Sequence, residues 1–132
     1  MEWGLTGHFA FNDPPASDEP CRDGDVSNSR TRTLTIPTTA QAQMCMGGTG
    51  GNWSIIPKRA VTLGMYELLM SKKVHLTFMQ SWHAGVLRRA LFGGVSGWCP
   101  SSFVQRHQNV EVTVTELATA LLLVNVAQRI AE

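Results

Sequence analysis

The residues best suited to chemistry lie near the start of this 132-residue chain, in residues 7–15 (GHFAFNDPP). His8 stands five residues before Asp13, in a turn bounded by glycine and proline. An imidazole is the side chain whose ordinary pKa suits proton transfer near neutral pH, and a nearby carboxylate fixes its tautomer and raises its basicity. The pair indicates acid–base chemistry, although a loop histidine beside an unrelated, solvated aspartate has the same spacing.

A second group of polar residues precedes a helical pattern in the middle of the chain. Ser81 can cap a helix over residues 82–92, in which Trp82, Val86 and Ala90 form one apolar stripe. The backbone amides at the start of such a helix can bind an anion. An ordinary N-cap without any ligand is the simpler interpretation of Ser81.

The elements that must position these residues alternate between strand and helix in the second half of the chain. Residues 74–79 are a short apolar β-prone run, and residues 110–114 alternate as a strand. Between them lie the helix over 82–92, ended by two glycines, and a helical turn after Pro100. This order favours parallel strands joined by crossovers and therefore an α/β fold.

The last predicted helix begins at residues 115–116 and runs to about Ile130. It is apolar on nearly every side between residues 118 and 127, so we expect it to be buried.

The first half of the chain has a weaker pattern. Residues 13–30 are rich in Pro, Asp, Ser and Gly and are typical of a solvated loop, whereas residues 31–36 are β-prone. Residues 61–63 fit either a short strand or the lead-in to a helix over 64–73. Residues 37–53 contain GGTGG, which predicts a flexible segment and lacks the lysine of a phosphate-binding G-x-x-x-x-G-K-[ST] loop.

The composition narrows the class of protein. The length predicts a single domain over residues 1–132, and 43% hydrophobic residues can form a packed core. The formal net charge is +1 and the densest basic clusters are pairs, which argues against nucleic-acid binding. The sequence has no apolar run of about 18 residues, so no membrane span is predicted. No secretory leader is expected either.

The three cysteines are an odd number without CxxC spacing. This pattern argues against a disulfide framework and a zinc site, and it favours a reducing cytoplasm. We therefore expect no metal and no cofactor.

Several segments resemble, in order, the glucosamine-6-phosphate deaminase/isomerase family. The matching segments, with the family patterns, are residues 7–14 (G-H-x-A-F-N-E/D-P), 29–32 (S-R-T-R), 56–64 (V-P-K-x-A-L/I-T-V/L-G), and 93–95 with 100–107 (G-x-V…P-A-S-x-L-Q-x-H). Together they cover roughly residues 4–120, so the resemblance extends over most of the chain.

The resemblance implies a three-layer α/β/α fold with a mainly parallel sheet, shared with ribose-5-phosphate isomerase and CoA transferases. Members of the family are about twice as long as this chain. We therefore expect the chain to be a partial domain that corresponds to their C-terminal half. The N-terminal half, with its phosphate loop and the acid that moves a proton between sugar carbons, would be missing.

The resemblance also implies roles for individual residues. His8 would open the sugar ring and shuttle a proton, with Asp13 in the place of the more usual glutamate. Thr6 stands where an aspartate is expected, and a hydroxyl cannot stabilise an imidazolium by charge; loss of such a carboxylate costs a few orders of magnitude in rate. His83 stands where the family has a phosphate-binding lysine, next to Ser81 and the helix start.

Three hypotheses for the function follow. The first is a cytoplasmic, homo-oligomeric enzyme that acts on an amino-sugar phosphate by aldose–ketose isomerisation with deamination. The second is a non-catalytic remnant or sugar-phosphate-binding module, which the missing half, Thr6 and His83 favour. The third is a structural interaction domain whose half-sheet is covered by a partner chain.

Overall fold

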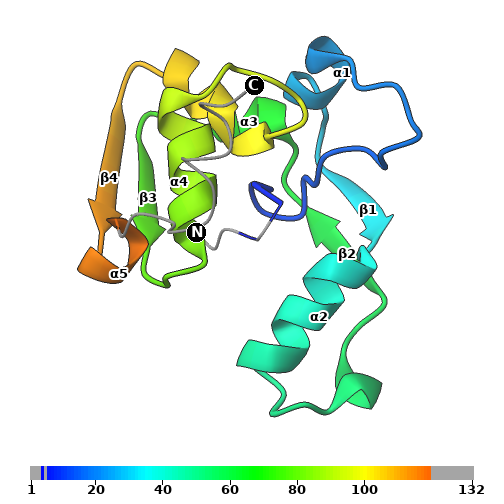
Figure 1. The fold of residues 1–132 in the computed structure, drawn as a ribbon. Helices are drawn as coiled ribbons and strands as arrows, with labels where there is room; N and C mark the ends of the chain where they lie inside the picture. Colours follow the sequence, from blue (N-terminus) through cyan, green and yellow to red (C-terminus); the bar gives the residue numbers. More distant parts are fainter. Residues whose placement is uncertain (1–3, 5, 120–132) are drawn as a thin grey trace, which may run out of the picture.

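The computed structural model describes residue 4 and residues 6–119. Its elements are α1 (Asp23–Ser27), β1 (Arg32–Thr35), α2 (Thr38–Gly47), β2 (Arg59–Thr62), α3 (Met65–Leu69), β3 (Val74–Phe78), α4 (His83–Phe92), β4 (Val110–Val114) and α5 (Glu116–Thr119), with 3-10 turns at Trp53–Ile55 and Pro100–Arg106 (Figure 1). The expected α/β class is confirmed. The predicted course of the last helix beyond Thr119 lies outside the described residues. None of the described helices is long and apolar enough to cross a membrane.

The second half of the chain forms the strand–helix–strand unit that its periodicity predicts. β3 pairs with β4 in parallel, from Val74 opposite Val110 to Phe78 opposite Val114. Every second residue of β3, beginning with Val74, is buried. The helix between the two strands, α4, packs against β3 (Figure 1). Val86, Leu87 and Ala90 of this helix are buried.

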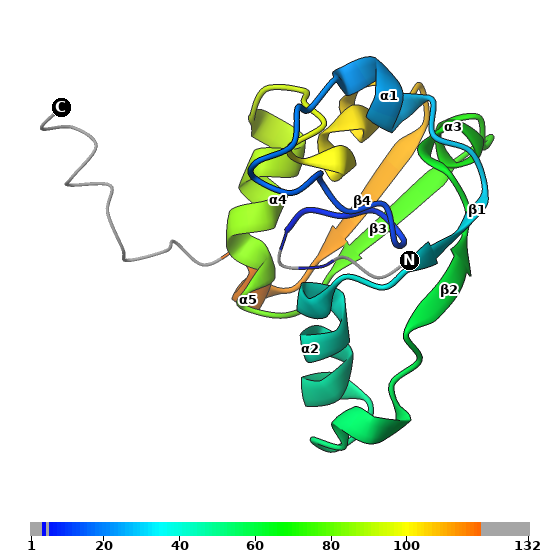
Figure 2. The same ribbon diagram turned by 90° about the vertical axis from the view of Figure 1, so that its right-hand side faces the viewer.

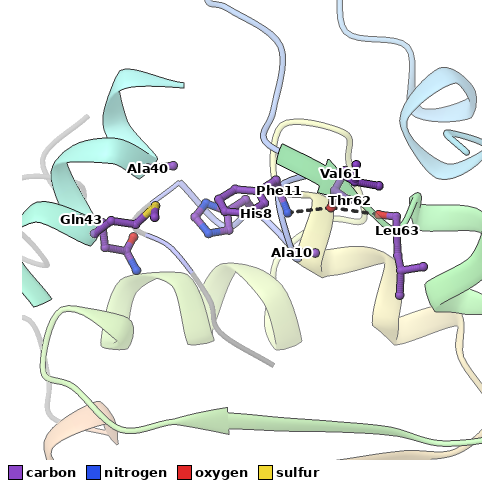
Figure 3. A pocket seen from close by; sticks show the side chains of 9 residues that line it. His8, Ala10, Phe11, Ala40, Gln43, Val61, Thr62 and Leu63 are labelled. Carbon is purple, nitrogen blue, oxygen red and sulfur yellow. Dashed lines mark hydrogen bonds between the residues drawn. The ribbon is translucent and has the colours of Figure 1, made fainter. Parts of the chain in front are cut away.

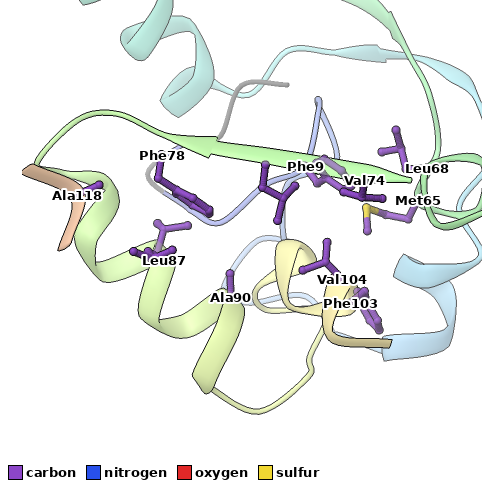
Figure 4. Close-up of a cluster of buried hydrophobic side chains, with 12 residues drawn as sticks. Phe9, Met65, Leu68, Val74, Phe78, Leu87, Ala90, Phe103, Val104 and Ala118 are labelled. Atoms are coloured by element: carbon purple, nitrogen blue, oxygen red, sulfur yellow. The ribbon is translucent and has the colours of Figure 1, made fainter. Parts of the chain in front are cut away.

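The hydrophobic core lies between this unit and the segments that cross it. Phe9, from the N-terminal motif, is only 2% exposed and belongs to the same cluster as the buried side chains of β3 and α4 (Figure 4). Full burial of a phenylalanine stabilises a fold by about 1.5–3 kcal/mol. The residue that follows His8 therefore anchors the N-terminal loop to the core.

The first half of the chain forms a two-stranded antiparallel ribbon. β1 pairs with β2, with Arg32 opposite Thr62 and Thr35 opposite Arg59. The prediction for residues 31–36 is thus confirmed, and residue 62 ends a strand. The N-terminal loop runs between this ribbon and α4, as Figures 1 and 2 both show.

Two helices occupy segments for which the sequence predicted loops. α2 covers most of the segment expected to be flexible, because its Ala, Gln and Met residues favour a helix and the glycine-rich run begins only at its end. α1 lies inside the predicted solvated loop, with Asp23 and Asp25 in its first turn, where acidic side chains suit the helix dipole. The prediction for α2 was wrong because the glycine-rich run at the end of the segment was taken to describe all of it. The prediction for α1 was wrong because a polar segment with acidic residues at its start can form a short helix.

Candidate functional site

The loop that carries His8 is fixed by a glycine that no other residue could replace without strain. Gly7 has φ +83°, and a Cβ added there would lie 2.8 Å from Sγ of Cys99. The carbonyl of Gly7 accepts a hydrogen bond from the amide of Ser101 at 2.9 Å. This hydrogen bond joins the loop, at the residue immediately before His8, to the 3-10 turn at Pro100–Arg106.

A tight turn follows His8 and brings Asp13 back toward it. The backbones of Phe9 and Asn12 exchange hydrogen bonds of 3.4 and 3.2 Å, and Ala10 between them has φ +56°. A non-glycine residue in the left-handed region is uncommon and costs of the order of 1–3 kcal/mol where it is imposed by the surroundings. The fold therefore maintains this turn against local strain.

Asn12 is the residue that holds the turn in place. Its side-chain amide donates to the carbonyls of Phe9 and Leu63, both at 2.8 Å, and its carbonyl oxygen accepts from Nη1 of Arg32 at 2.8 Å. Asn12 is 1% exposed, so these bonds satisfy a buried polar group. The sequence did not reveal this role, because the bonds to Leu63 and Arg32 join residues far apart along the chain.

Three side chains of this loop meet in one cluster. The hydroxyl of Thr6 lies 2.8 Å from Oδ1 of Asp13 and 3.2 Å from Nδ1 of His8, and the latter two atoms are 3.3 Å apart. A hydroxyl has a single proton, so a Thr6 that donates to Asp13 accepts from the Nδ1–H of His8. This arrangement gives His8 the tautomer with the proton on Nδ1 and the lone pair on Nε2.

The other edge of the His8 ring carries Nε2, the nitrogen that this tautomer leaves as a base. Among the described residues, none makes a hydrogen bond to Nε2. A Cβ added to Gly4 would lie 1.7 Å from Cε1 of His8, so the ring packs directly against a backbone without a side chain. His8 is thus held in one orientation, 7% exposed, with its basic nitrogen without a protein partner in the described part of the chain.

His8 borders a cavity of about 350 Å³. Its lining is His8, Ala10 and Phe11 from the loop, Ala40, Gln43 and Met44 from α2, and Val61, Thr62 and Leu63 from the end of β2. Figure 3 shows His8 and Phe11 between the side chains of α2 and those of β2. Small-molecule sites commonly have volumes of about 300 to 1,000 Å³, so the cavity is large enough for a small ligand.

A second cavity of about 310 Å³ borders Asp13 and is lined in part by Arg22, Arg32 and Cys21. Oδ2 of Asp13 is buried and has no hydrogen-bond partner among the described residues. Burial, and then the neighbouring carboxylate of Asp23, raise the pKa of Cys21, which keeps this thiol protonated rather than nucleophilic.

His83 is placed very differently from His8. Its Nδ1 accepts hydrogen bonds from the amides of Met79 and Gln80 at 3.1 and 3.2 Å. The ring is stacked on Trp82, with centroids 5.4 Å apart, and meets the ring of Phe78 edge to face. These contacts bind the imidazole to the segment between β3 and α4.

Ser81 does not cap the helix as the sequence predicted. α4 begins at His83, its N-cap is Trp82, and no side chain makes a capping hydrogen bond. The carbonyl of Ser81, rather than its hydroxyl, accepts from the amide of Ala84 at 3.1 Å. Neither Ser81 nor His83 lines the cavity beside His8, so the structure brings together Thr6, His8 and Asp13 and leaves the two phosphate candidates apart from them.

The arginines of the SRTR run have structural partners. Arg30 lies over the ring of Tyr66 at 3.4 Å and pairs with Glu67 at 3.5 Å, whereas Arg32 binds Asn12. Within the described residues, no three His, Cys, Asp or Glu side chains cluster closely enough to hold a metal ion.

Comparisons with known proteins show what the chain as a whole is similar to. No protein-family model matches the chain. Glucosamine-6-phosphate deaminases of Rhodopirellula baltica and Shewanella loihica are each 29% identical to it over 119 residues, or 90% of the chain. The chain spans only 43% and 40% of their lengths, less than half of either.

A solved structure described as a monomeric glucosamine-6-phosphate deaminase of the NagB superfamily superposes on 88% of the chain with a TM-score of 0.74 and 27% identity. The match covers 44% of that protein. The fold is therefore that of an α/β protein of this superfamily. Within it, the resemblance to the glucosamine-6-phosphate deaminase family that the ordered motifs predicted is confirmed, and the partial coverage agrees with a match to one half of the family's length.

Proposed function

We propose that the chain carries the ring-opening, proton-transferring part of a glucosamine-6-phosphate deaminase/isomerase activity on an amino-sugar phosphate. The observation that carries this proposal is the cluster in which Thr6 and Asp13 hold Nδ1 of His8, while Nε2 has no hydrogen-bond partner among the described residues and the ring borders a cavity. The sugar class is inferred from the relatives, whose names give their substrate.

In the proposed step, Nε2 of His8 removes the proton from the anomeric hydroxyl O1 of the closed sugar. The C1–O5 bond breaks, C1 becomes an aldehyde carbon, and the imidazolium returns the proton to O5. Asp13, 3.3 Å from Nδ1, stabilises the positive charge on the ring, as an orienting carboxylate does in other histidine catalysts. Isomerisation to the ketose and loss of ammonia would follow on the open chain, and the motifs of this chain locate no acid for that carbon-to-carbon proton transfer.

The ring-opening step can be tested without the later steps. The α and β anomers of glucosamine 6-phosphate interconvert through the open chain, and exchange NMR measures that rate. We expect the protein to accelerate the exchange, the His8→Gln variant to lose the acceleration, and a control variant at the exposed His75 of β3, His75→Gln, to keep it. Release of ammonia and fructose 6-phosphate tests the complete reaction in the same samples. Equal exchange rates with wild type and His8→Gln would refute the proposal.

A sugar-phosphate-binding module without catalysis is the second candidate. It is favoured by Thr6, because the cluster holds a neutral hydroxyl where the family resemblance implies a carboxylate. Saturable binding of glucosamine 6-phosphate with no change in the anomer exchange rate would support this candidate over the enzyme.

Self-association and a cytoplasmic location also remain proposals. Exposed apolar side chains such as Phe92 (83%) and Met70 (67%) support self-association, although the structural neighbour is described as monomeric. Light scattering during size-exclusion chromatography tests it directly. The location is supported by the free thiols of Cys21, Cys45 and Cys99.

A further inference from the structure

One end of the β1–β2 ribbon lies against the turn that follows His8. At this end Arg32 of β1 stands opposite Thr62 of β2. Nη1 of Arg32 donates a hydrogen bond to Oδ1 of Asn12 at 2.8 Å. Oγ1 of Thr62 accepts one from the amide of Phe11 at 3.2 Å (Figure 3). Both side chains of one cross-strand pair therefore bind neighbouring residues of the same turn.

The bond from Arg32 decides which way the side-chain amide of Asn12 faces. Such an amide has an acceptor oxygen and a donor NH₂ group, and a guanidinium can only donate. Arg32 therefore binds the oxygen, and the NH₂ group is left to donate to the carbonyls of Phe9 and Leu63. Thr62 is 4% exposed, and its hydroxyl also donates to the carbonyl of Leu63, so its own orientation is set as well.

We propose that Arg32 and Thr62 are positioning residues for His8, which act through the turn to set the tautomer and direction of its ring. The catalytic part of this inference rests on the proposed function. The two residues that the pair binds lie between His8 and Asp13 in the chain, so a shift of either changes the 3.3 Å separation of Nδ1 and Oδ1. Misplacement of a reacting group by about 1 Å can lower a rate by about 100-fold.

The other end of the same ribbon offers a matched control. There Thr35 of β1 stands opposite Arg59 of β2, the same two residue types with the strands exchanged. Both side chains are exposed, and in the part of the chain that the structure describes neither makes a hydrogen bond to the His8 turn. A substitution at this pair therefore changes the ribbon but leaves its bonds to the turn intact.

The test removes the two bonds with Arg32→Met and Thr62→Val in the full chain. Arg59→Met and Thr35→Val are the controls. Exchange NMR on glucosamine 6-phosphate measures ring opening, and the nitrogen chemical shifts of the His8 imidazole report its tautomer without any sugar. We expect Arg32→Met to slow ring opening roughly ten-fold, as the loss of one hydrogen bond would, and to give a mixture of His8 tautomers. Its Kd for the sugar should not change, because Arg32 does not line the cavity beside His8.

Conservative variants distinguish positioning from folding. Arg32→Lys keeps a donor for Asn12, and Thr62→Ser keeps the hydroxyl. Both should stay within about three-fold of the wild-type rate and keep the wild-type tautomer. The controls at Thr35 and Arg59 should do the same. If the buried Thr62→Val does not fold, the variants of the exposed Arg32 decide the question alone.

The outcomes separate this inference from the proposed function. If the wild type accelerates anomer exchange, but Arg32→Met slows it no more than Arg59→Met does, the pair has no positioning role and the proposed function stands. If the wild type does not accelerate the exchange, the proposed function fails, and the tautomer of His8 still tests the positioning role. One tautomer in the wild type and a mixture in Arg32→Met would support that role, whereas the same tautomer in both proteins would overturn it.

Discussion

His8 and His83 are buried to the same extent, 7% exposed each, but their surroundings give their rings opposite roles. Nδ1 of His8 meets a hydroxyl and a carboxylate, which leave the proton on that nitrogen and the lone pair on Nε2. Nδ1 of His83 instead accepts from the amides of Met79 and Gln80, so the lone pair on that nitrogen is already bound. Burial alone does not distinguish a reactive histidine from a structural one; the identity of its partners does.

The backbone around His8 also differs from the backbone around His83. His8 follows a glycine with positive φ and precedes a turn in which Ala10 also has positive φ, so its position depends on distant contacts. His83 lies in the first turn of a regular helix, and its ring accepts hydrogen bonds from the backbone only three and four residues earlier in the chain. Backbone strain such as that at Ala10 persists only where the surrounding structure imposes it, and such strain is common at functional sites.

The largest expected effect comes from placing the same substitution at both histidines. Glutamine keeps hydrogen-bonding capacity but cannot transfer a proton. We expect His8→Gln to lower the acceleration of anomer exchange by roughly 10²–10⁴-fold, the usual contribution of a general acid–base group, and His83→Gln to lower it by less than about five-fold. Exchange NMR on glucosamine 6-phosphate measures both.

Thermal unfolding of the same two variants is the control for this comparison. His83→Gln should lower stability by about 1–3 kcal/mol, because the hydrogen bonds from the amides of Met79 and Gln80 to Nδ1 are lost. A large loss of rate in a fully folded His83→Gln protein would show that the distinction between the two histidines is wrong.

The next effect concerns the support of the His8 loop. Asn12→Ala removes three side-chain hydrogen bonds, two donated to the carbonyls of Phe9 and Leu63 and one accepted from Arg32. At about 1 kcal/mol for each bond, urea denaturation should show a loss of roughly 2–4 kcal/mol. Asn109→Ala is the matched control, because that exposed side chain makes one bond of 3.2 Å to Lys72, and it should cost less than about 1 kcal/mol.

A smaller effect is expected from the hydroxyl between His8 and Asp13. Thr6→Val keeps the shape of the side chain but removes the hydrogen bonds to both partners. A loss of one such bond corresponds to about a ten-fold lower rate of ring opening. Thr6→Ser retains the hydroxyl and should stay within about three-fold of wild type; equal losses in the two variants would mean that the hydroxyl does not orient His8.

The sequence predicted well what depends on local periodicity. The apolar β-prone run of residues 74–79 and the stripe of residues 82–92 correspond to β3 and α4, in which every second, or every third to fourth, residue enters the core. The same reasoning failed over residues 37–53. The glycines there end a helix rather than prevent it, since α2 closes at Gly47.

In the candidate site, too, local contacts could be predicted from the sequence and long-range contacts could not. The proximity of His8 and Asp13 follows from a short turn, so the sequence could indicate it. The bond from Arg32 to Asn12 joins residues 20 positions apart, and the bond from Asn12 to Leu63 joins residues 51 apart. Such contacts depend on the docking of the β1–β2 ribbon against the loop. No periodicity encodes that docking, so the role of Asn12 could be found only in three dimensions.

The smallest expected effect lies on the exposed face of β3–β4, where side-chain pairs are solvated. The hydrogen bond from Lys73, and then its charge, lower the pKa of Glu111 below its ordinary value of 4.5, and His75 on the opposing strand acts in the same direction. A carboxyl group whose pKa is lowered on folding stabilises the fold above its ordinary pKa, and that stability is lost as the pH falls through the lowered value.

Glu111→Gln should therefore be slightly less stable than wild type at neutral pH, and the stabilities of the two proteins should converge in acid. Glu116→Gln is the control, because Glu116 has no ion pair among the described residues. Because exposed pairs contribute little, the difference should be small beside that of Asn12→Ala, and a larger one would mean that this face, rather than the His8 loop, governs the stability of the fold.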